Sequence, residues 1–425
     1  MPPLFLHRAR RHIALGTCVS ALLLAGWLAR PGTEVYAGAQ AAAQSASRPA
    51  QSQAEAPRKG TAGVPRFEWD PSWPKPLPDN MVTGAVGGVA VDSQNRIWIA
   101  HRPGTLGKAG GEATAGDTLR NFGKPAPSLL QFAQDGTLLR TMGGPGAGYE
   151  WITTEHGVYV DGKGSIWVNG SGARDHHILK FAPDGKFLLQ IGRAGQSKGS
   201  NDTQNLGAPA GIDVDDAANE VYVADGYRNR RVIVFDATTG AYKRHWGAYG
   251  NKPDDTYDFG GRYLRKLTAS GPLPTQFHTP VHCAKVSKDG LVYVCDRTNG
   301  RVQVFRKDGT FVKEFLIFPR VTADLGFSAD AEQRFMYVTD FIHEKVWILR
   351  RADGTILGSF GRPGHYGGAF TIAHSLAVDR NGHIYVTESL EGKRVQRFLF
   401  KGLGFADASE TVAPAQYEGR FDPSR

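Results

Sequence analysis

The sequence predicts an all-β protein, a six-bladed β-propeller, from three observations. Alternating strands separated by polar turns recur along the chain, Asp-Gly turns join many of them, and no helical pattern of comparable length competes. The strand units return every 40 to 50 residues or so, with insertions, which is about the period of a four-stranded propeller blade. A chain of 425 residues is long enough to hold six such blades.

Each repeat opens with two alternating strands around a turn. The six openings are "GGVAVDSQNRIWIAHR" from Gly87, "HGVYVDGKGSIWVNG" from His156, "AGIDVDDAANEVYVADGY" from Ala210, "HCAKVSKDGLVYVCDR" from His282, "DLGFSADAEQRFMYVTD" from Asp324 and "HSLAVDRNGHIYVTES" from His374. Third and fourth strands follow most of them, as in "ILKFAPDGKFLLQIG", "VIVFDATTGAYKRHWG" and "VQVFRKDGTFVKEF". The last repeat, "IYVTESLEGKRVQRFLFKG", is short of its outer strand. We expect "RFEWDP" near Phe67 to supply that strand and close the ring.

The ends of the chain differ in composition from the repeats. Residues 1–39 read as a signal peptide, because a basic start, "MPPLFLHRARRH", precedes the short apolar core "IALGTCVSALLLAGWLA" and a small-residue cleavage site near Ala39. Residues 40–64 have the composition of a low-complexity linker, 65–405 hold the propeller, and 406–425 form a C-terminal tail. We therefore expect an exported protein, periplasmic or extracellular, with no stable membrane span after signal cleavage.

The charge pattern argues against nucleic-acid binding. The formal net charge is +9, but several of the arginines lie in the predicted signal and linker. No dense run of Lys and Arg is interleaved with aromatic residues, as a nucleic-acid surface would require. We expect a small-molecule or peptide substrate instead, and the sequence does not set an oligomeric state.

Two of the three cysteines belong to the predicted propeller. Cys18 lies in the signal, whereas Cys283 and Cys295 flank "AKVSKDGLVYV" symmetrically about its turn. An antiparallel hairpin would place these two opposite each other, and export would permit a cross-strand disulfide. Two unpaired, half-buried thiols are the equally weighted alternative.

Three histidines occupy one register position of the repeat. Aligning the six openings puts Gly87, His156, Ala210, His282, roughly Ala323, and His374 at the same place, at the start of each inner strand. Histidine fills alternate blades, so the three imidazoles should point at the propeller axis from directions about 120° apart. With 13 histidines in 425 residues, chance alone would give such a set roughly once in a few thousand trials.

Three neutral imidazoles that converge on one point form a tridentate zinc site. Such a site leaves a fourth position open for water or substrate, so catalysis becomes feasible. The structural alternative is that each histidine is a hydrogen-bonded polar plug in the channel. That alternative is the better explanation for a lone histidine, but three in register favour the metal.

Two further candidates lie at the ends of second strands, on the same face as the starts of the first strands. Arg102 in "IWIAHRPG" is a fixed cation that can pair with a carboxylate. Tyr227 in "VYVADGYRNRRV" carries a phenol that could act as a general base beside cationic groups. Taken alone, either residue would more often be a surface hydrogen-bonding group.

The strings "GVAVD…AHR", "HGVYVD", "VYVADGYRNRR", "VHCAKV…DRTNGRVQVF" and "AHSLAVDRNGHIYV" resemble a known family. They are similar to the NHL-repeat propeller of the peptidyl-α-hydroxyglycine α-amidating lyases, the lyase domain of peptidylglycine α-amidating enzymes. The resemblance covers about residues 67–403, and "ADGYRNRR" and "DRTNGR" are its more specific parts. It implies a lyase that cleaves a hemiaminal, peptide–NH–CH(OH)–COO⁻, into an amide and glyoxylate.

The resemblance also implies site residues. It makes His156, His282 and His374 zinc ligands, and it gives Tyr227 and Arg102 catalytic roles. It further implies a structural calcium ion, held by the backbone carbonyls of Val89 and Val158 and by a carboxylate directly after the last histidine.

This chain departs from the family at three positions. Ser375 stands in place of the calcium carboxylate, so we expect calcium binding to be weakened or lost. Ile372 replaces a methionine and Arg228 replaces a disulfide cysteine. These changes touch the predicted pocket wall and suggest a different substrate.

Two other functions compete with the lyase hypothesis. The first is a non-catalytic exported NHL propeller that binds protein or glycan, which would hold no metal at the channel mouth. The second is a calcium-dependent lactonase, which would need a Glu/Asn/Asp set around the axis rather than histidines.

Overall fold

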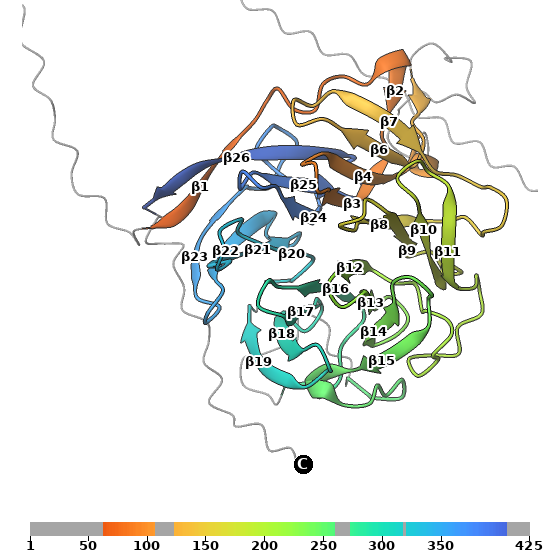
Figure 1. Ribbon diagram of the computed structural model, residues 1–425. Coiled ribbons are helices and arrows are strands. Elements are labelled where there is room, and N and C mark those ends of the chain that lie inside the picture. Colours follow the sequence, from red (N-terminus) through yellow and green to blue (C-terminus); the bar gives the residue numbers. More distant parts are fainter. Residues whose placement is uncertain (1–62, 107–122, 260–272, 318–319, 406–425) are drawn as a thin grey trace, which may run out of the picture. The chain divides into compact units, whose positions relative to one another are not determined.

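The computed structural model describes residues 63–106, 123–259, 273–317 and 320–405. Six four-stranded antiparallel sheets radiate around a central axis, with β3, β8, β12, β16, β20 and β24 innermost (Figure 1). The predicted all-β, six-bladed propeller is therefore confirmed. The predicted signal peptide, most of the linker and the C-terminal tail lie outside the described residues.

The strands of the blades follow the repeats in order, from the inner to the outer strand. Blade one comprises β3 (Ala85–Val91), β4 (Ile97–Arg102), β6 (Leu129–Phe132) and β7 (Leu138–Met142). Blade two comprises β8 (Glu155–Val160), β9 (Ile166–Gly170), β10 (His177–Phe181) and β11 (Phe187–Gly192). Blade three comprises β12 (Gly211–Asp215), β13 (Glu220–Asp225), β14 (Arg231–Asp236) and β15 (Tyr242–Trp246).

Blade four comprises β16 (Val281–Val286), β17 (Leu291–Asp296), β18 (Arg301–Arg306) and β19 (Phe311–Leu316). Blade five comprises β20 (Leu325–Phe327), β21 (Phe335–Asp340), β22 (Lys345–Arg350) and β23 (Ile356–Phe360). Blade six comprises β24 (Ala373–Val378), β25 (Ile384–Glu388), β26 (Arg394–Gly404) and β1 (Val64–Trp69). The short strands β2 (Met81–Val82) and β5 (Lys124–Pro125) pair in parallel. Three 3-10 turns, η1 (Pro78–Asn80), η2 (Pro103–Thr105) and η3 (Ala248–Gly250), are the helical elements of the described chain.

The ring closes as the sequence predicts. β1 pairs with β26 in antiparallel fashion, and Phe67 lies opposite Phe400. The N-terminal strand thus completes the blade formed by the C-terminal repeat. This pairing joins the two ends of the propeller and leaves neither end blade incomplete.

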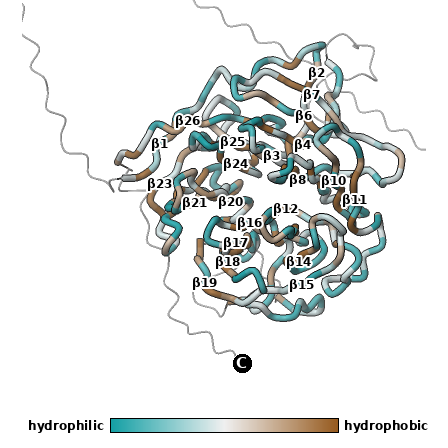
Figure 2. Tube along the Cα trace, viewed as in Figure 1, coloured by the Kyte–Doolittle hydropathy of each residue, from teal (hydrophilic) through white to brown (hydrophobic). Residues whose placement is uncertain are grey.

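The hydrophobic core is divided among the contacts between neighbouring blades. Tyr222 and Trp246 of blade three pack with Val292 and Phe305 of blade four, for example. The cluster that contains Trp73 joins strands of blades one and six, so the series of contacts runs around the whole ring. Figure 2 accordingly shows hydrophobic segments in all six blades, with hydrophilic turns between them.

Within the described residues no helix has the length and apolar character that a bilayer crossing requires.

Candidate metal centre

The structure brings the three register histidines together. His156 on β8, His282 on β16 and His374 on β24 are buried, and their ligand atoms all lie within 4.8 Å of one another. The ring centroids are 5.0, 4.7 and 4.9 Å apart for the pairs 156–282, 156–374 and 282–374. The near-equal sides describe a triangle, as expected for side chains on alternate blades. No other group of three or more His, Cys, Asp or Glu in the described chain has a metal-binding geometry.

A β-bulge marks the histidine position in each of these three blades. The pairing register shifts between Glu155 and Gly157 in β8, between Val281 and Cys283 in β16, and between Ala373 and Leu376 in β24. A bulge bends the strand locally and can redirect a side chain. We infer that it turns each imidazole out of the blade and toward the axis.

Each histidine is fixed by a backbone carbonyl of the next blade. Nδ1 of His156 lies 2.7 Å from the carbonyl oxygen of Ala210, Nδ1 of His374 lies 2.7 Å from that of Gly87, and Nδ1 of His282 makes the same contact with Ala323. A carbonyl can only accept, so each Nδ1 carries the proton and donates. The Nε2 lone pairs are then free to bind a metal, and this kind of anchoring is typical of metal-bound histidines.

The carbonyls that anchor the histidines belong to the register residues of blades one, three and five. Histidine blades therefore alternate with blades whose small register residue offers its backbone oxygen. A larger side chain has little room at one of these positions, because a Cβ on Gly87 would lie 2.7 Å from the carbonyl oxygen of His156. The alternation of histidine and small residues in the sequence therefore corresponds to two alternating roles: the histidines offer nitrogen ligands, and the small residues offer the carbonyls that anchor them.

The histidines are held in their neutral form. Burial, followed by the charges of Arg102 and Arg297, lowers the pKa of His374 to about 3. Burial also takes the pKa of His156 and of His282 well below the usual 6.5, with nearby His374 and Arg297 respectively adding to the effect. Neutral imidazole is the form that binds metal ions.

Tyr227 lies directly against this centre. Its hydroxyl oxygen is 2.9 Å from Nε2 of His156 and 3.1 Å from Nε2 of His282. Gly226 allows this approach, because a Cβ there would come within 2.2 Å of the backbone nitrogen of Val281, at the start of β16. The turn after β13 therefore packs on the strand that carries His282.

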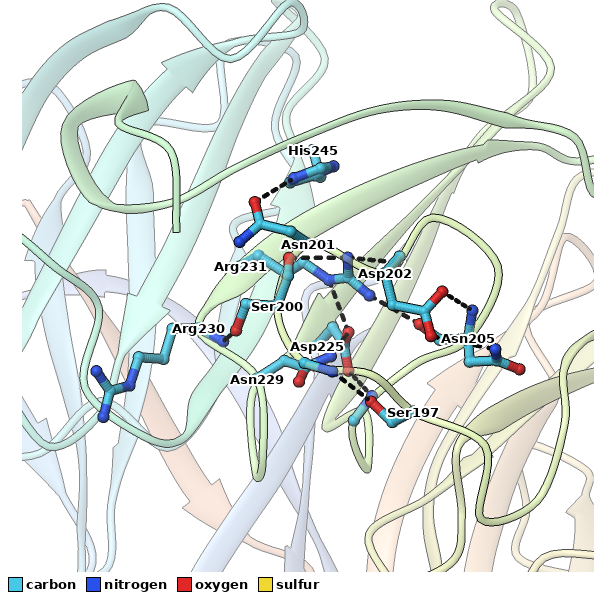
Figure 3. Close-up of polar contacts among 12 residues, drawn as sticks. Ser197, Ser200, Asn201, Asp202, Asn205, Asp225, Asn229, Arg230, Arg231 and His245 are labelled. Carbon is cyan, nitrogen blue, oxygen red and sulfur yellow. Dashed lines mark hydrogen bonds and ion pairs between the residues drawn. The ribbon is translucent and has the colours of Figure 1, made fainter. Parts of the chain in front are cut away.

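A buried ion pair holds the turn that carries Tyr227 (Figure 3). Nε of Arg231 donates to Oδ2 of Asp225 at 2.9 Å, and neither side chain is exposed. Nδ2 of Asn229 donates to the same oxygen at 2.7 Å. The remaining nitrogens of Arg231 donate to carbonyls of the preceding loop, those of Ser200, Asp202 and Asn205. The motif "DGYRNRR" thus fixes the backbone on both sides of the tyrosine.

Arg102, at the end of β4 in blade one, contacts both neighbouring blades. Its Nε donates to the carbonyl oxygen of Glu155 at 2.7 Å, and Nη1 lies 3.4 Å from Oγ of Ser389 in blade six. Burial lowers the pKa of the guanidinium, but an arginine keeps its proton in proteins. A fixed positive charge therefore lies beside His156 and His374.

Sequence reasoning missed a second arginine, Arg297, which the structure places beside Tyr227. Its Nη1 is 3.4 Å from the Tyr227 hydroxyl, and its guanidinium lies over the rings of Tyr227 and Phe341, 5.6 and 5.3 Å from their centroids. It directly follows β17, as Tyr227 closely follows β13. Checking the end of every second strand, rather than two of them, would have found it.

A buried ion pair and a disulfide bond hold Arg297 and His282 in position. Asp296 pairs with Arg301 in a second fully buried ion pair, with Nε to Oδ2 at 2.7 Å. The disulfide between Cys283 and Cys295 joins β16 to β17. Of the two alternatives that the sequence allowed, the structure has the disulfide. It lies next to His282 on one strand and close to Arg297 on the other.

The predicted calcium ligands include no carboxylate. Val89 and Val158 lie on the inner strands β3 and β8, but Ser375 offers a hydroxyl, which donates to Oδ2 of Asp324 at 2.6 Å. That carboxylate already faces an ammonium group, with Nζ of Lys285 3.6 Å from Oδ1. The donor set therefore lacks the uncompensated anionic oxygens that calcium prefers.

Comparison with known proteins shows what the chain is similar to. The family model for the NHL repeat matches residues 281–305, which include His282 and Arg297. The chain is thus a six-bladed β-propeller in which one segment matches the NHL repeat.

Three relatives are similar to most or about half of the chain. Peptidyl-glycine alpha-amidating monooxygenase B of Xenopus laevis is 27% identical over 334 residues, 76% of this chain and 34% of that protein. Peptidyl-alpha-hydroxyglycine alpha-amidating lyase 2 of Drosophila melanogaster is 26% identical over 257 residues, 57% of this chain and 54% of that protein. NHL repeat-containing protein 3 of Mus musculus is 29% identical over 354 residues, 79% of this chain and 84% of that protein. The chain spans about a third of the length of the Xenopus relative.

Proposed function

We propose that this protein is an exported, zinc-dependent lyase that cleaves the C–N bond of a peptidyl-α-hydroxyglycine-like hemiaminal. The single observation that carries the proposal is the cluster of three buried histidines, each anchored through Nδ1, with Tyr227 in contact and two arginines nearby. Relatives named as amidating lyases support the choice of reaction.

His156, His282 and His374 would hold the zinc ion. Three neutral nitrogen ligands with an open fourth position are typical of catalytic zinc. Bound there, zinc would supply Lewis-acid chemistry toward an oxygen of the substrate.

Tyr227 is suited to move the proton of the substrate hydroxyl. The hydroxyl oxygen of Tyr227 lies within hydrogen-bond distance of Nε2 of His156 and of His282. A substrate hydroxyl that binds beside these Nε2 atoms would therefore also lie close to Tyr227. Tyr227, acting as a phenolate, would take the hydroxyl proton, and the O–H electron pair would become the second bond of the glyoxylate carbonyl. The C–N electron pair would leave with the amide nitrogen, which would receive that proton from Tyr227, so that the amide forms and the phenolate is restored.

Arg102 and Arg297 provide positive charge on both sides of this position. The proposed substrate has a carboxylate next to the reacting carbon, and its reacting oxygen gains negative charge as the proton leaves. Planar guanidinium groups suit carboxylates because they offer paired N–H donors in a fixed geometry. We assign the two arginines to orienting the carboxylate and stabilising the developing charge.

Replacing Arg297 with methionine should lower kcat/KM on a peptidyl-α-hydroxyglycine by about tenfold or more, since a charge-assisted hydrogen bond to the carboxylate is lost. Steady-state kinetics would measure this. Arg350→Met is the matched control, because Arg350 ends β22, its side chain is 51% exposed and pairs with Asp353 outside the site, and its loss should leave kcat/KM nearly unchanged. Equal kinetics for Arg297→Met and the wild type would remove Arg297 from the site.

Export is part of the proposal. The basic and apolar start of the sequence has the pattern of a signal peptide, and the disulfide between Cys283 and Cys295 suits an oxidising compartment. Detection of the mature protein outside the cytoplasm, with an N-terminus near residue 40, would support it. An unprocessed protein retained in the cytoplasm would contradict it.

A non-catalytic binding role is the second candidate, because the relative named NHL repeat-containing protein 3 aligns with 84% of its length. The two functions differ in products. Incubation of the zinc-loaded protein with a peptidyl-α-hydroxyglycine should release amide and glyoxylate in equal amounts, and chelation should stop the release. No release from any such peptide would favour the binding role.

A further inference from the structure

A chain of polar side chains crosses the inner strands of blades two to six, a few residues beyond the histidine level. We call it the channel belt; its members are Tyr159, Asp213, Lys285, Asp324 and Ser375. The hydroxyl of Tyr159 lies 3.5 Å from the carbonyl oxygen of Val214, next to Asp213, and Asp213 interacts electrostatically with both Tyr159 and Lys285. Nζ of Lys285 lies 3.6 Å from Oδ1 of Asp324, whose Oδ2 accepts from Oγ of Ser375 at 2.6 Å. One residue per blade thus links five successive blades.

The belt contains two buried carboxylates and one ammonium. Asp213 and Asp324 are only 7% and 6% exposed. Backbone N–H groups donate to both, from Val286 to Asp213 at 2.7 Å and from Leu325 to Asp324 at 2.9 Å. Buried anions need a nearby cation as well as hydrogen bonds. Lys285 is the cation that interacts with both of them.

The belt is joined to the histidine centre through the backbone. Asp324 directly follows Ala323, whose carbonyl anchors Nδ1 of His282. Ser375 directly follows His374, and Lys285 lies three residues after His282 on β16. The contacts of Asp324 with Lys285 and Ser375 therefore tie together blades four, five and six next to two of the three histidines.

We propose that Lys285 is the internal cation of this channel, that it takes over the charge-balancing role of a bound divalent ion, and that through Asp324 it positions His282 and His374. Lys285 is a positioning residue on this account, since it acts through Asp324 and the backbone. The proposal rests on the zinc site of the proposed function, but it does not depend on the lyase reaction. It also gives a physical reason why Ser375 can stand where a carboxylate would serve calcium.

The first test compares the zinc-loaded protein with and without millimolar calcium, by thermal unfolding. The melting temperature should stay unchanged, because the belt already has its cation. A rise of several degrees would show that calcium binds the folded channel and would overturn the proposal.

The second test uses Lys285→Met, with Lys285→Arg as the matched control that keeps the charge. Methionine leaves the buried carboxylates without their cation, so the melting temperature should fall by about 5 °C or more. Zinc affinity, measured by competition with a chromophoric chelator, should fall by about tenfold. Arginine should preserve most of both properties. Wild-type stability and zinc affinity in Lys285→Met would overturn the proposal.

A double variant distinguishes a charge-pair effect from simple damage to packing. In Lys285→Met/Asp324→Asn one of the two unpaired carboxylates is gone, while the amide oxygen can still accept from Ser375. This variant should recover a large part of the lost stability and zinc affinity. If Lys285→Met fails to fold, recovery of folding in the double variant would still test the pairing of Lys285 with Asp324. A double variant no better than Lys285→Met would contradict the pairing of Lys285 with Asp324.

Discussion

Tyr227→Phe should lower kcat on a peptidyl-α-hydroxyglycine by about 10² or more, the scale of a lost general base, while leaving the fold and the zinc content almost unchanged. The substitution removes one oxygen, which is the atom that contacts Nε2 of His156 and of His282. The ring remains, and with it the edge contacts to both imidazoles and the stacking of Arg297. Glyoxylate release under saturating substrate would measure the effect.

The control for this substitution is Tyr366→Phe, since the Tyr366 side chain is 82% exposed and has no place in the proposed site. It should retain the wild-type kcat. If Tyr227→Phe were as active as Tyr366→Phe, the proton acceptor would be another group, and the role given to Tyr227 would be wrong.

His282→Ala should abolish measurable lyase activity and weaken zinc binding by about 10² or more, because one of three ligand nitrogens is lost. The substitution also removes the donor to the Ala323 carbonyl, so the channel loses one of its three links between neighbouring blades at this level. Chelator competition would give the affinity. His245→Ala is the matched control, because His245 contacts Tyr242 and Asn201 in blade three and the preceding loop, outside the centre.

The fold could be predicted because its period and its turns are local features of the sequence. The same alignment that counted the blades placed His156, His282 and His374 in one register, and it found the closing strand near Phe67. Propeller symmetry then converts a register into a position in space, which is why convergence of the histidines could be foreseen.

Other parts of the site depend on details that an alignment of repeats cannot show. Asp324 lies one residue after its register position and Lys285 three residues after its own, so nothing in their spacing indicates that they meet. The β-bulge at His282 inserts an extra residue before Lys285 in β16, whereas β20 pairs with β21 without a bulge. The carbonyl anchors are likewise backbone features that depend on how neighbouring blades pack.

Arg297 and the disulfide show two different limits. The position of Arg297, directly after the second strand of its blade, can be identified from the sequence repeats. Its contact with Tyr227 cannot, because that contact joins two blades and depends on the turns held by Asp225 and Asp296. For Cys283 and Cys295 the hairpin predicted proximity, and their pairing required the exact strand register.

Elemental analysis of the purified protein, prepared without chelators, tests the central claim most directly. We predict about one zinc per chain in the wild type and His245→Ala, and a sharply reduced content in His282→Ala, because the three histidines are proposed to form a single site. A wild-type protein without any transition metal, or zinc content unaffected by His282→Ala, would contradict a metal centre built by these histidines.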